Sequence, residues 1–142
     1  MKSIFCRIKQ LPTENEMTSK PVIAIVDDDH LVRTGTGSLM RSLGYGIQAF
    51  SSAEAFLRSD VQSFDCLISD VQMLGMSGLE LQKILESTAP RLPVIFLTAF
   101  PNDRMESIFS RDGICYYLEK PCSPDELCAC VAKVIGGTGS AP

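Results

Sequence analysis

The sequence predicts an α/β fold in which a parallel sheet is covered by helices. Strand-like apolar runs alternate with helix-like segments about five times along the chain. The first run, Val22–Val26, is apolar throughout, as expected for a strand that helices cover on both faces. A length of 142 residues suits one domain with a substantial core.

The first helix is expected directly after the first strand. Residues 31–43 carry apolar side chains at helical spacing, although Gly35 and Gly37 each cost about 1 kcal/mol relative to alanine. Gly44 predicts the end of this helix, and residues 46–50 are expected to form the second strand.

Three later helix starts share one signature. A serine followed three positions later by glutamate predicts a reciprocal capping box, in which each side chain bonds the backbone of the other residue. The pairs are Ser51 with Glu54, Ser77 with Glu80, and Ser123 with Glu126. Pro124 strengthens the last start, because proline suits the first position of a helix. A further helix is expected between Asn102 and Ser110, which gives five helices.

Charged or hydroxyl residues follow most of the strand-like runs. Residues 22–26 lead into Asp27, Asp28 and Asp29, residues 66–69 into Asp70, residues 94–97 into Thr98, and residues 116–118 are soon followed by Lys120. In an open α/β sheet, ligands bind outside the carboxyl ends of the strands, so these residues should meet in one crevice. The sequence therefore predicts one acidic site that also holds a lysine and a hydroxyl.

This set of residues favours phosphate chemistry with a divalent cation. Clustered carboxylates repel one another, and oxygen ligands with open water positions suit Mg²⁺. Lys120 and Thr98 could supply a charge and a hydrogen bond to a phosphoryl group. Asp70 stands alone at a strand end before a glycine-containing loop, so it is the candidate nucleophile. Asp29 is expected to be a helix cap rather than a ligand.

Composition excludes several classes of protein. The net charge of -4 offers no basic surface for nucleic acid, so this chain is not expected to bind DNA directly. No apolar run approaches the roughly 18 to 20 residues that span a bilayer. The cysteines are expected to be cytosolic thiols, because only His30 offers an imidazole and the spacing of Cys128 and Cys130 lacks a matching second pair for zinc.

The ends of the chain differ from the middle. Residues 1–20 have no strand or helix period and predict a loose N-terminal extension. Residues 21–135 hold the alternating pattern and form the expected domain. Residues 136–142, with the sequence GGTGSAP, have the composition of a flexible linker.

The order of four motifs, IVDDD, CLISDVQMLGMSGLEL, VIFLTA and YYLEKP, resembles the receiver domain of bacterial two-component response regulators. Stretches such as AFSSAEAFL are most similar to the nitrogen-fixation regulator class, whose fuller members carry a helix-turn-helix output domain that these residues do not contain. The resemblance implies a flavodoxin-like, doubly wound five-stranded sheet of order 2-1-3-4-5. One residue departs from it, because Leu74 stands where the family usually has proline.

The resemblance also implies a role for each residue. Asp70 would accept the phosphoryl group, while Asp27, Asp28 and the main-chain carbonyl of Gln72 would hold Mg²⁺ with it. Thr98 and Lys120 would contact the phosphoryl group, and the Lys120–Pro121 bond would be cis. Tyr117 would be the aromatic switch that turns inward as Thr98 moves, although strand alternation alone allows either Tyr116 or Tyr117 on a given side.

The implied function is signalling in the cytoplasm rather than enzymatic turnover. A sensor histidine kinase or phosphotransfer protein would phosphorylate Asp70 and so change the face formed by the fourth helix, fifth strand and fifth helix. A downstream protein of unknown identity would read that change, and phosphorylation could promote a homodimer.

Two other functions remain open at this point. The chain could be an interaction module that keeps the fold without phosphorylation. Alternatively, the spacing of Asp27 and Asp29, with Thr98 and Lys120 later, resembles the motif order of haloacid dehalogenase-type phosphatases. In that case Asp27 would be the nucleophile and Asp29 the general acid, and Asp70 would have no role.

Overall fold

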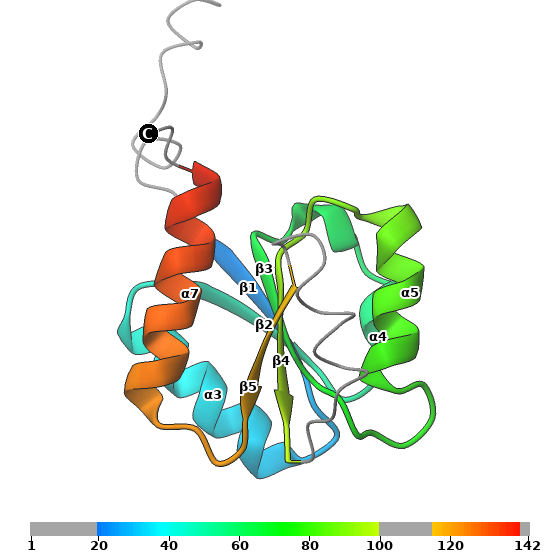
Figure 1. Cartoon of the computed structure of the whole chain (residues 1–142), viewed down its shortest axis with the longest axis horizontal. Coiled ribbons are helices and arrows are strands. Elements are labelled where there is room, and N and C mark those ends of the chain that lie inside the picture. Colours follow the sequence, from blue (N-terminus) through cyan, green and yellow to red (C-terminus); the bar gives the residue numbers. More distant parts are fainter. Residues whose placement is uncertain (1–19, 100–114, 140–142) are drawn as a thin grey trace, which may run out of the picture.

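The protein is a five-stranded parallel sheet with helices on both faces (Figure 1). The computed structural model describes residues 20–99 and 115–139. The strands are β1 (Val22–Val26), β2 (Gly46–Phe50), β3 (Cys66–Asp70), β4 (Val94–Thr98) and β5 (Cys115–Glu119). All neighbouring strands pair in parallel, in the order β2-β1-β3-β4-β5. The predicted sheet and its strand order are confirmed.

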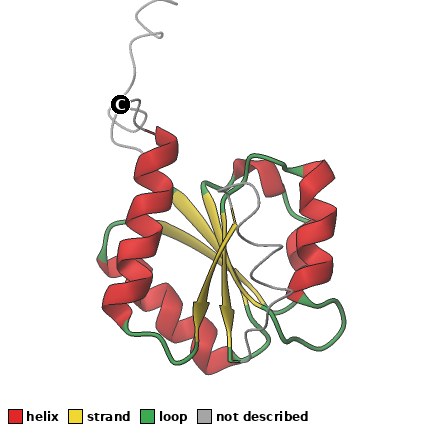
Figure 2. Cartoon of the chain, viewed as in Figure 1, coloured by secondary structure: helices red, strands yellow, loops and turns green. Residues whose placement is uncertain are grey.

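Four α-helices lie within the described residues. They are α3 (His30–Ser42), α4 (Ala53–Leu57), α5 (Gly78–Thr88) and α7 (Pro124–Gly139), and a short 3-10 turn, η1, covers Val61–Ser63. Helices α3 and α7 cover one face of the sheet, while α4 and α5 cover the other (Figure 2). The helix expected between Asn102 and Ser110 falls outside the described residues, as does almost all of the expected N-terminal extension.

Alternating strand residues supply the two cores. In β1, Ala24 and Val26 pack on the side of α4 and α5, whereas Ile23 and Ile25 pack on the side of α3 and α7. This follows from the two-residue period of a strand. The central strands β3 and β4 are buried along their whole length, while the edge strands are partly exposed. No helix in the described part of the chain is long and apolar enough to cross a membrane.

Two of the three predicted capping boxes are present. Ser77 with Glu80 and Ser123 with Glu126 exchange both hydrogen bonds. The box predicted at Ser51 is wrong, because α4 is capped one residue later, where Ser52 accepts from the Ala55 amide. The third helical position is therefore an alanine, which has no carboxylate to return the bond.

The ends of α3 and α7 show how glycine acts in this chain. Helix α3 runs unbroken through its internal glycines and ends where Gly44 takes a φ of 95°, as predicted. Helix α7 continues to Gly139, although a linker-like tail was expected from Gly136. Glycine lowers helix propensity by about 1 kcal/mol per residue, but an established helix propagates more easily than it nucleates.

Candidate functional site

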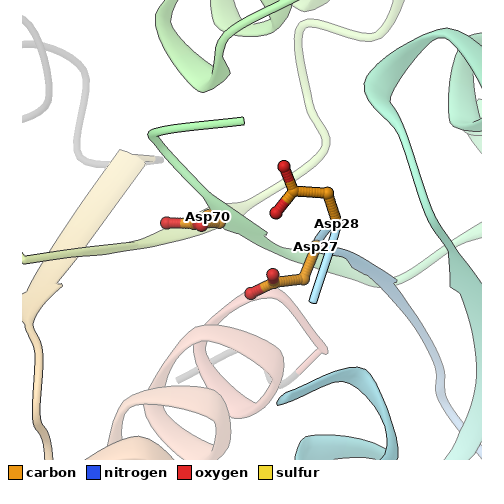
Figure 3. A group of neighbouring side chains, drawn as sticks. All are labelled: Asp27, Asp28 and Asp70. Carbon is orange, nitrogen blue, oxygen red and sulfur yellow. The ribbon is translucent and has the colours of Figure 1, made fainter. Parts of the chain in front are cut away.

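Strand register brings three aspartates together at one edge of the sheet (Figure 3). Val26 of β1 pairs with Ser69 of β3, so Asp27, which follows β1, and Asp70, the last residue of β3, both lie at the carboxyl ends of these neighbouring strands. Asp28 follows directly, and one carboxylate oxygen from each of the three aspartates lies within 4.8 Å of the others. The sequence prediction that these carboxylates share one site is confirmed.

Asp27 is the most deeply buried of the three aspartates. It is 2% exposed, and its Oδ1 accepts a hydrogen bond from the Asp29 amide at 2.9 Å. Burial raises the pKa of Asp27, and the nearby charges of Asp70 and Asp28 add to this, while the Asp29 amide and Lys120 oppose it. A cation beside Asp27 would therefore relieve both lost solvation and repulsion.

Asp28 is exposed and is bound by the loop that follows β3. Its Oδ2 accepts a hydrogen bond from the Leu74 amide at 3.0 Å. The Leu74 side chain is 83% exposed, so the contribution of this residue to the site comes from its backbone.

Asp70 lies at the end of β3, where its carboxylate contacts a backbone amide and a lysine. Oδ1 accepts from the Val71 amide at 2.8 Å and lies 3.3 Å from Lys120 Nζ. Helix α5 begins in close contact with the backbone of Asp70. A Cβ at Gly78, its first residue, would lie only 2.7 Å from the Asp70 carbonyl oxygen and 2.9 Å from the Phe96 ring. Glycine at position 78 is therefore what allows α5 to start against the site.

Lys120 bridges the acidic group. Its Nζ lies 3.3 Å from Asp70 and 3.8 Å from Asp27, with the side chain 29% exposed. Its amide donates to the Thr98 carbonyl at 2.7 Å, which continues the pairing of β5 with β4, and its peptide bond to Pro121 is cis, as the resemblance implied. One ammonium opposes three carboxylates within the described residues, so a divalent cation would balance the site.

Thr98 is fully buried beside the site. It follows Leu97, which pairs with Asp70, and its Oγ1 lies 3.4 Å from Gln72 Oε1. The side chain of Gln72 is exposed, and the role of its main-chain carbonyl stays a prediction.

The two tyrosines of β5 face opposite layers. Tyr117 packs on the α4 and α5 side, while Tyr116 packs on the other side with Lys133 Nζ 5.7 Å from its ring centre. Strand alternation alone did not decide which tyrosine faces which side, and the structure shows that Tyr117 faces α4 and α5. Movement of Tyr117 remains a prediction.

Asp29 serves as the cap of α3. Its Oδ1 accepts from the amides of Leu31 and Val32 at 2.9 and 3.3 Å, as predicted. The phosphatase alternative needs Asp29 as a general acid, but here its Oδ1 is occupied as the cap of α3 by two backbone amides. The geometry argues against that alternative.

Sequence reasoning missed several contacts near the site. Glu54 was assigned to a capping box, but its carboxylate bonds the Met76 amide in the loop after Asp70. The amides of Val71 and Leu74 were also missed, because every residue except proline carries such a donor and the loop path decides its partner.

The donor set fits Mg²⁺. All three clustered ligands are carboxylate oxygens, which hard cations prefer, and the exposed position of Asp28 leaves room for water ligands. Asp27, Asp28 and Asp70 are the described side chains that could hold the ion.

Comparison with known proteins identifies the family. Residues 23–132 match the family model of the response regulator receiver domain. The chain belongs to this family and contains a receiver domain of the two-component type.

Relatives of known name agree with this assignment. The transcriptional regulatory protein FixJ of Bradyrhizobium diazoefficiens is 33% identical over 120 residues, which cover 84% of this chain and 58% of FixJ. The response regulator protein TodT of Pseudomonas putida is 36% identical over 115 residues, which cover 80% of this chain and 51% of TodT. The chain thus spans about half the length of the curated relatives that it matches.

Solved structures show the same fold. Full-length FixJ from B. japonicum has a TM-score of 0.75 at 32% identity, over 86% of this chain and 61% of that one. A CheY-like receiver domain protein from Methanospirillum hungatei has a TM-score of 0.77 over 84% of this chain and 96% of its own, with 22% identity, and so supports the fold alone.

Proposed function

We propose that this domain is a Mg²⁺-dependent phosphoacceptor whose modified residue is Asp70. The observation that carries the proposal is the group formed by Asp27, Asp28 and Asp70 with Lys120 Nζ 3.3 Å from Asp70. A sensor histidine kinase or phosphotransfer protein is the proposed donor, and we place the transfer in the cytoplasm. The domain would act as a signalling switch that catalyses only its own phosphorylation and dephosphorylation.

The contacts of Asp70 suggest which oxygen reacts. Within the described residues, the Val71 amide and Lys120 both bond Oδ1, which leaves Oδ2 to attack phosphorus. A phosphorus–oxygen bond forms on Asp70 while the bond from phosphorus to the donor's histidine nitrogen breaks, and the nitrogen keeps the electron pair. The product is an acyl phosphate, and the charge that develops on its oxygens needs positive partners.

The neighbouring residues would supply those partners. Asp27, Asp28, Asp70 and the main-chain carbonyl of Gln72 would hold Mg²⁺, which neutralises phosphoryl oxygens when bound. Lys120 would pair with another phosphoryl oxygen, and Thr98 would donate a hydrogen bond from its hydroxyl.

The same contacts suggest how the signal would leave the site. Phosphorylation adds about 1.5 to 2 negative charges, which would draw the Thr98 hydroxyl away from Gln72 Oε1, its partner at 3.4 Å. Tyr117 on the neighbouring strand would then turn inward and alter the face that includes β5 and α7. A downstream protein or a second copy of the domain would read this face.

Intact mass after incubation with acetyl phosphate tests the proposal. We expect the wild type to gain one phosphoryl group in Mg²⁺, no gain when EDTA removes the metal, and no gain for Asp70→Asn. Asp27→Asn serves as a second variant. A gain that persists in Asp70→Asn but requires Asp27 would contradict the assignment and revive the phosphatase alternative. No gain in any condition would indicate a phosphorylation-independent interaction module.

A further inference from the structure

Glu54 contacts the loop between β3 and α5 from a separate element. It lies in the first turn of α4, where Ser52 caps the helix by accepting from the Ala55 amide. The Glu54 carboxylate is therefore not needed for capping. Its Oε2 instead accepts a hydrogen bond at 3.0 Å from the amide of Met76, 22 positions along the chain.

The loop is shaped to receive this carboxylate. Gly75 takes a φ of 77°, a conformation that side chains disfavour. A Cβ at Gly75 would also lie 3.0 Å from Glu54 Oε2 and 3.5 Å from Oε1. The glycine thus provides both the turn and the space that bring the Met76 amide onto Glu54.

A second carboxylate also holds this loop. Asp28 accepts from the Leu74 amide at 3.0 Å, two residues before the Glu54 contact. Asp28 belongs to the acidic group, so a bound cation would compete for its oxygens, whereas Glu54 lies outside that group. Glu54 is therefore the anchor that can hold the loop in both the metal-free and the metal-bound protein.

We propose that Glu54 is a positioning residue for the metal site. By fixing the Met76 amide, it holds the loop that begins directly after Asp70 and so places the main-chain carbonyl of Gln72 toward the Mg²⁺ position. This inference rests on the proposed function, because it assigns Glu54 to the same metal site. Residues that orient metal ligands from outside typically change metal affinity by about 10- to 100-fold when they are lost.

Calorimetric titration of Mg²⁺ into the whole chain tests the inference with three variants. We expect Glu54→Ala to weaken Mg²⁺ binding about 10-fold. Glu54→Gln keeps an oxygen acceptor for the Met76 amide and should recover most of the affinity. Ser52→Ala removes the cap of the same helix without touching the loop, so it should bind Mg²⁺ as the wild type does. The NMR signal of the Met76 amide should shift strongly in Glu54→Ala alone.

Each outcome decides a different question. If the wild type binds no Mg²⁺, the proposed function fails and the inference fails with it. If the wild type binds and Glu54→Ala binds equally well, the inference alone is wrong. It is also wrong if Glu54→Gln is as weak as Glu54→Ala, which would indicate charge acting at a distance, or if Ser52→Ala is as weak, which would indicate loosening of α4. If Glu54→Ala does not fold, the test uses Glu54→Gln alone. The NMR signal of its Met76 amide must then stay at the wild-type shift, and a strong shift would contradict the inference.

Discussion

Leu74 supplies a hydrogen bond that proline could not supply. The resemblance to receiver domains leads one to expect proline here, and proline has no backbone donor. In this chain the Leu74 amide bonds Asp28 Oδ2 at 3.0 Å. The departure from the family pattern therefore gives a second carboxylate contact to the loop, made to a residue that we propose as a metal ligand.

Leu74→Pro should lower stability in the absence of metal and increase the response to Mg²⁺. Losing the hydrogen bond to Asp28 should cost about 1 kcal/mol, and it frees a carboxylate oxygen for the ion. Urea unfolding with and without Mg²⁺ measures both effects. Leu74→Ala keeps the amide and should stay within about 0.5 kcal/mol of the wild type. Identical behaviour of the two variants would show that the bond contributes nothing.

Cys66 should make the protein sensitive to alkaline pH. Burial raises the pKa of its thiol from 9.0 to about 12, with smaller contributions from Cys130 and Asp65. The unfolded chain releases this proton near pH 9 while the folded chain holds it, so its stabilisation is complete below pH 9 and is lost as pH rises toward 12. Between pH 8 and pH 10 the free energy of unfolding should fall by about 1 kcal/mol more in the wild type than in Cys66→Ala. Urea unfolding at the two pH values measures this fall. An equal fall in the wild type and in Cys66→Ala would contradict the prediction.

The same substitution should have opposite effects at two helix positions. At Gly78, the first residue of α5, a Cβ would meet backbone and ring atoms at 2.7 to 2.9 Å. Gly78→Ala should therefore cost at least about 2 kcal/mol and slow phosphorylation, because the Asp70 carbonyl must move. At Gly35 in α3 there is open space, and Gly35→Ala should stabilise the protein by about 0.5 to 1 kcal/mol without changing phosphorylation. Thermal unfolding with acetyl phosphate labelling measures both, and stabilisation by Gly78→Ala would refute the close-packing argument.

Elements were predictable where one local interaction decides the structure. The bounds of β1 and β2 and the caps at Ser77 and Ser123 follow from local pattern and capping chemistry. The predicted start of α4 was wrong because two adjacent serines, Ser51 and Ser52, can each cap the helix, and the local signature favoured Ser51. The competing contact of Glu54 with Met76 depends on tertiary structure, which no local pattern contains.

For the whole molecule, topology explains why the site could be predicted. Parallel strands place their carboxyl ends at one end of the sheet. Residues at or just after these ends, such as Asp27, Asp70 and Lys120, therefore meet regardless of loop conformation. The loop contacts could not be predicted in this way. They join backbone amides to carboxylates, and an amide carries no sequence signal apart from the exclusion of proline.

The last prediction concerns the stability of the whole domain, which Mg²⁺ should increase. Three carboxylates have ligand oxygens within 4.8 Å of one another, and among the described residues only Lys120 forms ion pairs with them. The folded state therefore gathers repulsion that the unfolded chain disperses. An ion that binds only the folded state stabilises it by about 2.7 kcal/mol at 100 times its dissociation constant. Denaturant unfolding should show this increase in the free energy of unfolding for the wild type. Most of the increase should be lost in Asp70→Asn and Asp27→Asn. Sodium chloride at equal ionic strength is the control, because screening alone would act without a specific site. If sodium chloride stabilised the wild type as much as Mg²⁺ does, the acidic group would be a repulsive cluster and not a metal site.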